Sequence, residues 1–271
     1  MTQPDQDAAR WDAHVDAYQH VFEPLTDAFN ARALAMLGPL DGVDVLDVAA
    51  GAGGAAMAAA ALGARVAAVD ASPAMVARIA ARAEDCTGPG KVAARLADAA
   101  ALPFPAASFG AALSSFGIVL LPDPAAGMAE LHRVLRPGGR AAVVTWTEPH
   151  RYEAAARLRA AVTAVQGAPP PMGDMPAQLR FTDPSRLRAL LAGAGFASIQ
   201  VERMEAALHA PSATDLAGSL GFAPGMAAML EGLGPDRAAV LRHFRERLEA
   251  DQGTGAVHLG AVAHVAVGVR L

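Results

Sequence analysis

A short apolar run that ends in a glycine-rich turn is the feature that most constrains how this chain can fold. Residues 43–48 read VDVLDV, residues 49–54 read AAGAGG, and the alanine-rich stretch that follows favours a helix. This pattern then recurs, with further strands expected at residues 65–69, 92–96, 109–114 and 140–146. Strands that alternate with helices in this way predict an α/β fold with a parallel sheet.

The second half of the chain departs from this alternation. The elements expected there are, in order, a helix at 153–165, a loop at 167–176, a helix at 184–194, a strand at 196–204, helices over 211–251 and a strand at 256–271. The loop is rich in proline and methionine, which is typical of a linker or of the edge of a lid. We therefore expect a helical lid beside the sheet.

Composition and charge argue against several classes of protein. The chain carries 22 Lys and Arg against 27 Asp and Glu, a formal net charge of −5, which disfavours a nucleic acid as its main partner. The single cysteine, Cys86, can form neither an internal disulfide nor a cysteine-based metal site, so a reducing compartment fits and no metal is expected. Neither a leader peptide nor a membrane-spanning run is recognisable, and we expect a cytoplasmic protein with no membrane partner.

The glycine-rich turn predicts a nucleotide-like ligand. Glycines at this turn let a ligand approach the backbone where Cβ atoms would otherwise collide. Asp70 ends the second expected strand 19 residues after Gly51, about where an acidic side chain accepts hydrogen bonds from a ribose diol. Residues 51–56 also match the dinucleotide pattern G-x-G-x-x-A, so the turn alone leaves a nicotinamide or flavin enzyme open.

Three further side chains favour an adenosyl ligand that carries positive charge. Asp47 ends the first strand, where a dinucleotide site usually needs only apolar residues, and its carboxylate suits the ammonium and sulfonium of S-adenosylmethionine. Asp98 can accept from the exocyclic amine of adenine while the backbone N–H of Ala99 reaches a ring nitrogen. Met75 can lay its thioether against the purine, although core packing would explain a methionine there equally well.

Four motifs follow one another between residues 43 and 147: VLDVAAGAG, AVDASPAMV, LADAAALPFPAASFGAALSSFG and ELHRVLRPGGRAAVVTW. In order and spacing they resemble the class I S-adenosylmethionine-dependent methyltransferases, and most closely the quinone-biosynthesis and natural-product small-molecule methyltransferases. The resemblance implies a Rossmann-like seven-stranded sheet, mostly parallel with the last strand antiparallel, with helices on both faces and a helical lid. It also implies S-adenosylmethionine at the carboxyl ends of the first four strands, and S-adenosylhomocysteine as the product.

Two positions depart from the family pattern. Ala49 stands where the family has the first glycine of its first motif, and Gly110 stands where an aspartate commonly opens the fourth strand. We expect Ala49 to adopt a negative φ, in which case the alanine would leave cofactor binding intact.

The N-terminal segment resembles the short helix that folds over the cofactor in this family. Tyr18 is expected to reach the carboxylate of the methionine part, with Phe22 or Thr26 at the entrance. Ser115 and Phe116, just past the fourth strand, are expected to face the methionine part or the acceptor. The cofactor-binding residues that we predict are Tyr18, Asp47, Ala49, Gly51, Gly53, Asp70, Ala71, Met75, Asp98, Ala99, Ser115 and Phe116.

A general base is needed if the acceptor is a hydroxyl or an acidic carbon. We assign this role to His14 in the N-terminal segment or to His150 just after the fifth strand, with His20 as a further candidate. His132 is expected to lie far from the cofactor. The predicted wall of the acceptor site, which would suit varied flat molecules, comprises Met172, Met175, Phe222, Met226 and Met229.

We expect residues 1–271 to form a single domain. Its predicted parts are an N-terminal helical cap (1–40), a cofactor-binding core (41–150), helical lid insertions (151–181 and 206–254) and the remaining core helix and strands (182–205 and 255–271). The predicted activity is methylation of a small, apolar or aromatic acceptor by a monomer or a homodimer. A nicotinamide-dependent oxidoreductase, a non-methylating cyclase or decarboxylase that uses the same cofactor, and a silent binding protein stay open as alternatives.

Overall fold

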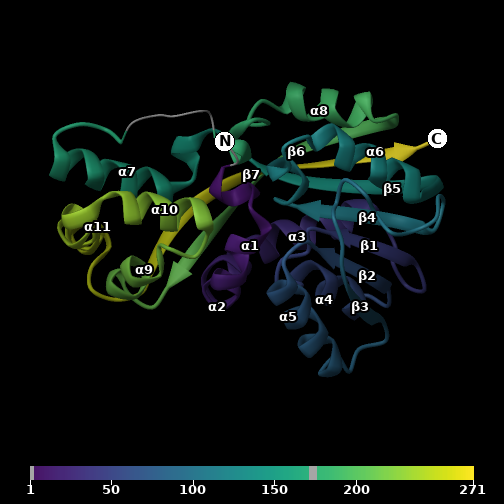
Figure 1. Cartoon of the computed structure of the whole chain (residues 1–271), viewed down its shortest axis with the longest axis horizontal. Helices are drawn as coiled ribbons and strands as arrows, with labels where there is room; N and C mark the ends of the chain where they lie inside the picture. The colour runs from purple at the N-terminus through teal and green to yellow at the C-terminus, as the bar shows by residue number, and fades with distance from the viewer. Residues whose placement is uncertain (1–2, 171–175) are drawn as a thin grey trace.

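Seven strands form one sheet in the order β3-β2-β1-β4-β5-β7-β6, as Figure 1 shows for the computed structural model. The structure describes residues 3–170 and 176–271. β7 runs antiparallel to both of its neighbours, and the other adjacent pairs are parallel, which confirms the predicted fold. The strands are β1 (Asp44–Val48), β2 (Arg65–Asp70), β3 (Lys91–Leu96), β4 (Phe109–Ser115), β5 (Leu135–Trp146), β6 (Phe196–Ala210) and β7 (Val257–Arg270).

Helices cover both faces of this sheet. Adjacent apolar side chains of β1 point to opposite faces, so each face has apolar surface to bury. Val45 belongs to one buried cluster, together with residues of α3, whereas Leu46 and Val48 belong to the other, together with residues of α6 and α8. The helices of the first face are α3 (Glu23–Leu37), α4 (Gly54–Ala61) and α5 (Pro73–Glu84), and those of the second are α6 (Pro124–Val134) and α8 (Pro184–Gly193).

The strand order reverses at β1, because the chain passes from β1 to β2 and β3 on one side and returns to β4 on the other. The connections that leave β1 and β4 therefore diverge, and a crevice opens at the carboxyl ends of these two strands. The glycine-rich turn lies at that end of β1, where the sequence predicts a ligand.

The N-terminal segment is helical, as predicted, but it is divided into short pieces. They are η1 (Pro4–Gln6), α1 (Ala8–Trp11), η2 (Asp12–His14), α2 (Val15–Ala17) and the π-helical η3 (Tyr18–Phe22), which leads directly into α3. π-helical turns inside longer helices occur frequently at functional sites. This one carries Tyr18.

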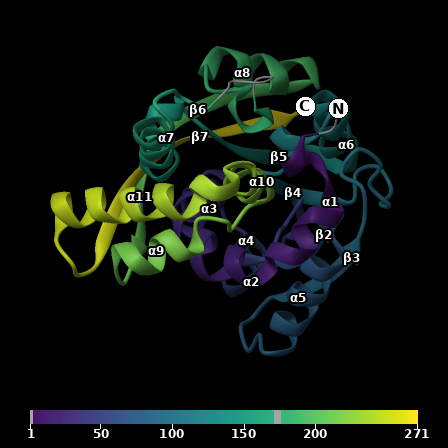
Figure 2. The same cartoon turned by 60° about the vertical axis from the view of Figure 1, so that its left-hand side comes forward.

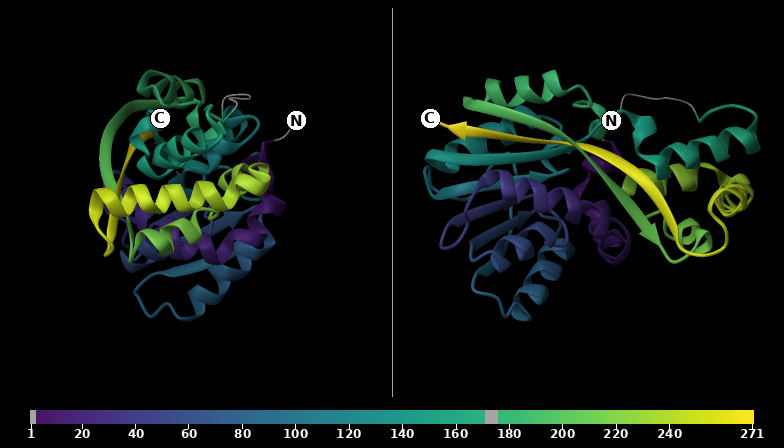
Figure 3. Two further views of the ribbon diagram at one scale, coloured as in Figure 1. Left: turned by 90° about the vertical axis from the view of Figure 1, so that its left-hand side faces the viewer. Right: turned by 180° about the vertical axis from the view of Figure 1, so that it is seen from behind.

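Four helices pack together beside the sheet, and we call them the lid. They are α7 (Glu153–Gln166), α9 (Ala213–Ser219), α10 (Pro224–Gly232) and α11 (Arg237–Gln252). Figure 3 shows that β6 and β7 extend beyond the other strands toward these helices. Shorter turns complete the chain, namely η4 (Ile118–Leu120), η5 (Pro149–Arg151), η6 (Ala177–Leu179) and η7 (Gly234–Asp236).

Two predicted boundaries are wrong. β6 does not end at Met204 but continues to Ala210, paired with β7 as far as Val257, so the segment predicted as a helical lid from residue 206 begins as a strand. β5 begins at Leu135, with an irregular register against β4, and not at residue 140 as predicted. In both places pairing with a neighbouring strand outweighs the local sequence signal.

Within residues 3–170 and 176–271 no helix combines the length and the apolar character that crossing a bilayer requires.

Candidate active site

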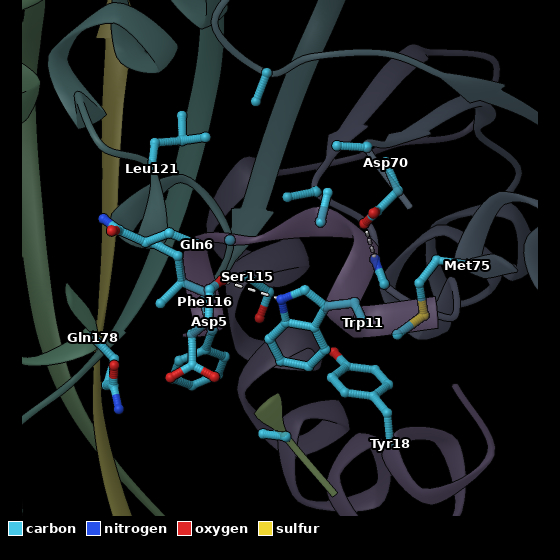
Figure 4. Close-up of a pocket in the computed structure, with 18 of the residues that line it drawn as sticks. Asp5, Gln6, Trp11, Tyr18, Asp70, Met75, Ser115, Phe116, Leu121 and Gln178 are labelled. Atoms are coloured by element: carbon cyan, nitrogen blue, oxygen red, sulfur yellow. Dashed lines mark hydrogen bonds between the residues drawn. The ribbon is translucent and has the colours of Figure 1, made fainter. Parts of the chain in front are cut away.

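One pocket of about 200 Å³ lies at the carboxyl ends of β1, β2, β4 and β5, beneath the N-terminal segment and beside the lid. Figure 4 shows it with Asp70 and Met75 on one side of Trp11 and with Asp5, Gln178 and Leu121 on the other. The residues that line it are Asp5, Gln6, Ala8, Trp11, Tyr18, Phe22, Ala49, Gly51, Asp70, Ala71, Met75, Ala97, Asp98, Ala99, Ser115, Phe116, Gly117, Leu120, Leu121, Trp146, Tyr152, Gln178, Phe222, Ala223 and Met226.

Asp70 joins the glycine-rich turn to the start of α5. Its Oδ2 accepts a hydrogen bond from the backbone N–H of Gly51 at 2.8 Å, and its Oδ1 accepts one from Ser72 N–H at 2.9 Å. Burial raises the pKa of this carboxyl, while the backbone N–H donors act in the opposite direction. Because each carboxylate oxygen has two lone pairs, both oxygens can accept a further hydrogen bond from a ligand in the pocket.

The glycine-rich turn leaves no room for larger side chains. Gly51 has a φ of +57°, and a Cβ at this position would lie 3.0 Å from Oη of Tyr18. Gly53 has a φ of +90°, which also favours glycine. The turn therefore forms a narrow cradle between Tyr18 and Asp70, as the close approach of a nucleotide to the backbone requires.

Ala49 corrects the expectation of a negative φ. Its φ is +56°, so an alanine occupies the left-handed conformation that the family glycine adopts readily, at a cost of roughly 1–2 kcal/mol. Gly117 makes this possible, since a Cβ on Gly117 would collide with the Cβ of Ala49. The missing side chain at residue 117 thus leaves space for the extra methyl group at residue 49.

The residues predicted to hold adenine lie together in the same pocket. Asp98 and Ala99 line it beside Asp70, and Asp98 Oδ1 accepts a hydrogen bond from Ala100 N–H at 2.8 Å. Met75 lines the pocket too, yet it is only 1% exposed and packs against Val15 and Ala52. Both explanations of Met75, as core and as ligand contact, therefore agree with its position.

Asp47 does not line this pocket but a small adjoining cavity. The cavity has a volume of about 10 Å³, which is room for one water-sized group, and Tyr18 and Ser115 line both spaces. Three buried polar atoms of residues around it have no partner, namely Asn30 Oδ1, Asp47 Oδ2 and Ser115 Oγ. Burial, followed by the nearby charge of Asp70, raises the pKa of Asp47 to about 7.

Aromatic side chains wall the other half of the pocket. The ring of Trp146 stacks on Phe116 with centroids 4.2 Å apart and on Tyr152 at 4.8 Å, and Phe22 stacks on Phe222 at 5.1 Å. The hydroxyl of Tyr152 is buried without a partner, and burial raises its pKa. An aromatic or other flat molecule fits such a chamber.

A carboxylate and two amides reach this aromatic half from segments far apart in the sequence. Asp5, Gln6 and Gln178 line the pocket, and Asp5 Oδ1 accepts a hydrogen bond from Gly225 N–H at 2.7 Å at the start of α10. Burial raises the pKa of Asp5, although the Gly225 N–H and the nearby His14 partly oppose this. Gln178 Oε1 is buried without a partner.

The histidines lie outside the pocket. His14 belongs to η2 and is near Asp5, whereas His150 is exposed in η5, and neither lines the pocket. The catalytic role assigned to them stays a prediction, and this geometry gives it no support. His20 is exposed, and His132 packs against Phe196 with ring centroids 5.2 Å apart.

The predicted entrance and acceptor residues are divided between several places. Phe22, Phe222 and Met226 line the pocket, Thr26 lines the small cavity and Met229 lines neither. Met172 and Met175 lie outside the described residues.

Sequence reasoning missed much of the aromatic half, including Asp5, Trp11, Trp146, Tyr152 and Gln178. Trp146 offered a usable signal, because it ends β5 on the edge where ligands bind. Asp5 and Gln178 offered none, since only the tertiary fold brings them together.

Comparisons with known proteins agree with this geometry. Residues 45–139 match the family described as methyltransferase domain. A nocamycin O-methyltransferase from Saccharothrix syringae is 33% identical over 185 residues, which cover 65% of this chain and 65% of that protein. A ubiquinone/menaquinone biosynthesis C-methyltransferase, UbiE, from a Geobacter species is 32% identical over 84 residues, which cover 31% of this chain and 36% of that protein.

The chain thus resembles the class I S-adenosylmethionine-dependent methyltransferases, with the family match over residues 45–139. The crystal structure of the YcgJ protein of Bacillus subtilis has the same fold, with a TM-score of 0.58 at 18% identity over 89% of this chain and 97% of that one. The matches in sequence cover 65% and 36% of the two curated relatives, so the activity of the whole protein is a separate question.

The residues present fit the cofactor of this family. The cradle at Gly51 lets an adenosyl group approach the backbone, and the free lone pairs of Asp70 can accept hydrogen bonds from a ribose. The unpartnered Asp47 Oδ2 and Ser115 Oγ can accept hydrogen bonds from an ammonium.

Proposed function

We propose that this methyltransferase transfers the methyl group of S-adenosylmethionine to a small, flat, apolar or aromatic molecule. One observation carries the proposal: a single pocket is lined at one end by the residues predicted to bind the cofactor, other than Asp47 and Gly53, and at the other end by stacked aromatic rings. Donor and acceptor would meet inside it.

Each end of the cofactor has matching groups in this chain. Asp70 would accept from the ribose hydroxyls, while Asp98 and Ala99 would pair with the adenine edge and Met75 would cover the adenine face. Asp47 and Ser115, beside the small cavity, would hold the ammonium of the methionine part. Tyr18, Ala49, Gly51, Gly53, Ala71 and Phe116 would complete the site.

The bound cofactor would supply an electrophilic methyl group and leave as a neutral thioether, S-adenosylhomocysteine. Because that leaving group is neutral, no strong acid is required, and the chain contributes mainly by positioning the acceptor. The rings of Phe22, Phe116 and Phe222 would orient it and exclude water. The N-terminal segment would cover the reacting groups.

The class of acceptor is supported by the aromatic walls and by the relatives. The names of the two relatives refer to nocamycin and to ubiquinone or menaquinone, which points to small molecules in biosynthesis. We also propose that the protein works in the cytoplasm, which its single cysteine supports. We further propose that it works as a monomer or a homodimer.

Titration calorimetry and mass spectrometry test this function. S-adenosylhomocysteine should bind and NADH should not, and incubation with S-adenosylmethionine and a panel of phenols, quinols and amines should add one methyl group to at least one of them. Binding of NADH but not of S-adenosylhomocysteine, or methylation only of peptide or RNA, would overturn the proposal.

Asp70→Ala provides the matched variant for the cofactor site. Loss of charge-assisted hydrogen bonds worth about 1.5–3 kcal/mol should weaken S-adenosylhomocysteine binding by roughly 10- to 100-fold. Asp85→Ala, on the exposed end of α5, is the control and should bind as the wild type does. Equal affinities for the two variants would remove Asp70 from the site.

A further inference from the structure

We propose that Asp5 is the general base of this methyltransferase and that its acceptor is a flat arene carrying a hydroxyl group. The inference deepens the proposed function and rests on it. It assigns the base to a carboxylate of the N-terminal segment rather than to a histidine.

Few ionisable side chains are available to take a proton from the acceptor. Those that line the pocket, among the residues the structure describes, are Asp5, Tyr18, Asp70, Asp98 and Tyr152. Asp70 and Asp98 lie at the cofactor end. Burial raises the pKa of both phenols, Tyr18 and Tyr152, so each stays protonated and donates rather than accepts.

Asp5 lies at the aromatic end and is held in place by the lid. The hydrogen bond from Gly225 N–H to Oδ1, 2.7 Å long, connects it to the start of α10, three residues after Phe222. The indole N–H of Trp11 also donates to the backbone carbonyl of Asp5, at 3.1 Å. The bond from Gly225 N–H engages Oδ1, which leaves Oδ2 for the acceptor.

The environment of Asp5 makes its carboxylate a stronger base than an exposed one. Burial raises the pKa of its carboxyl, which brings the proton affinity of the carboxylate closer to that of a phenolate. The charge also discriminates between acceptors. An ionised Asp5 would keep an amine as an ammonium, which has no lone pair to attack with, whereas it makes a hydroxyl more nucleophilic.

Two further groups indicate that the acceptor carries a second polar group. The hydroxyl of Tyr152 and Oε1 of Gln178 are buried, line the pocket and have no partner. Unpartnered buried groups of this kind cost about 1–3 kcal/mol each, and a bound ligand with matching atoms would remove that cost. An arene with two oxygen substituents fits this arrangement better than a hydrocarbon with one.

The step balances as follows for a hydroxyl acceptor. The O–H bond breaks, and its proton moves to Oδ2 of Asp5. The oxygen uses a lone pair to bond to the methyl carbon, and the electrons of the broken carbon–sulfur bond remain on sulfur. The products are a methyl ether, a neutral thioether and a protonated Asp5, which then returns its proton to solvent.

The experiment compares Asp5→Asn with Asp7→Asn, using catechol as the probe because its hydroxyls stay protonated in water at neutral pH. Asn keeps an oxygen for the Gly225 hydrogen bond but cannot take a proton. Asp7 lies in the same segment, caps α1 through Ala9 N–H and does not line the pocket. Both variants are titrated with S-adenosylhomocysteine, then with catechol in its presence, and are assayed for methyl transfer against pH.

We expect Asp5→Asn to lower kcat at least about 100-fold, the contribution of a positioned base, and to lose the acidic limb of the pH profile. It should bind catechol about tenfold more weakly while S-adenosylhomocysteine affinity changes less than twofold. Asp5→Glu should restore part of the activity, and Asp7→Asn should resemble the wild type.

Three results would overturn the inference while leaving the proposed function intact. They are an Asp5→Asn variant that keeps kcat within threefold, an Asp7→Asn variant that loses as much as Asp5→Asn, and a wild type that methylates amines but neither catechol nor phenol. A wild type that fails to bind S-adenosylhomocysteine would instead contradict the proposed function.

Discussion

Ala49 and Gly117 act as a pair at the residue scale. Ala49 adopts a φ of +56° at the point where the chain leaves β1, and the space for its methyl group exists because residue 117 has no side chain. The alanine that replaces the family glycine at residue 49 is therefore accommodated by Gly117, which lies in another motif 68 residues along the chain.

Gly117→Ala should destabilise the protein because its Cβ would collide with that of Ala49. Overpacking of this kind costs about 1–3 kcal/mol, to be measured by urea unfolding. The double variant Ala49→Gly/Gly117→Ala should recover most of the loss, since the nearest remaining atoms, Ala49 O and Ser114 Oγ, would lie 3.1 Å from the new Cβ. Additive effects of the two changes would show that the residues do not interact.

Asp47 makes stability depend on pH. Its folded pKa of about 7 lies above the ordinary value of 3.8, so below pH 4 the carboxyl is protonated in both states. Between pH 4 and 7 only the unfolded state ionises, and the free energy of unfolding falls, by up to about 4 kcal/mol, before levelling off above pH 7. Asp47→Asn should lack this decline and be more stable than the wild type at pH 8, by urea unfolding.

Asp44→Asn is the control on the same strand. Arg65 and Arg136 hold the pKa of Asp44 below its usual range, so this carboxylate stabilises the fold above that range and its loss should have the opposite sign at pH 8. If the stability of Asp47→Asn fell in parallel with the wild type between pH 4 and 7, Asp47 would not be the responsible group.

At the scale of elements, a buried ion pair joins α3 to α5 beneath the glycine-rich turn. Arg82 on α5 donates to Glu23 on α3 at 2.8 Å and to the carbonyl of Ala52 at 2.7 Å. Glu23 is only 6% exposed, and Arg82 is the cation that pairs with it. The pair thus fixes the turn between two helices.

Arg82→Met should cost about 3–5 kcal/mol in the free energy of unfolding, because it leaves Glu23 buried and unpaired. The double variant Arg82→Met/Glu23→Leu should recover most of this, since an apolar replacement of a buried pair is often neutral. Arg78→Met, one turn earlier on α5, is the control and should cost about 1 kcal/mol or less, because its partner Asp16 is exposed. Chemical unfolding distinguishes these outcomes, and equal costs for Arg82→Met and Arg78→Met would contradict a buried role.

The sequence predicted the elements whose signals are local and missed those that depend on partners. The strands of the core could be predicted because each is a compact apolar run bounded by turn residues, and Asp70 and Asp98 follow from their place at strand ends. The end of β6 could not, since Ala206, Ala207 and Ala210 have little preference for strands and pair only because β7 lies beside them. Asp5 lies next to Gly225, 220 residues away, and no local pattern announces such a contact.

At the scale of the whole molecule, the N-terminal segment connects the core to the lid. Figures 1 and 2 show α1 and α2 near both α5 and the lid helices. Asp12 Oδ1 accepts from Ala74 N–H at 3.1 Å at the start of α5. On the lid side Gly225 N–H donates to Asp5 at 2.7 Å, and in η6, which packs against β5, Ala177 N–H donates to Gln3 at 2.7 Å. The segment therefore closes the pocket by contacts with both parts.

Removal of residues 1–11 should open the pocket without unfolding the sheet, because the buried clusters on the two faces of the sheet contain none of these residues. Hydrogen exchange should accelerate at the amides of Ala177 and Gly225, which lose their acceptors, while the amides of β1, β4 and β5 keep their protection. Affinity for S-adenosylhomocysteine should fall, since Trp11 forms part of the wall. Arg10→Ala, which removes only a 3.6 Å ion pair with Asp7, should change none of these quantities. Loss of protection across the strands as well would mean that the segment is part of the cooperative core and does not act as a separate cover.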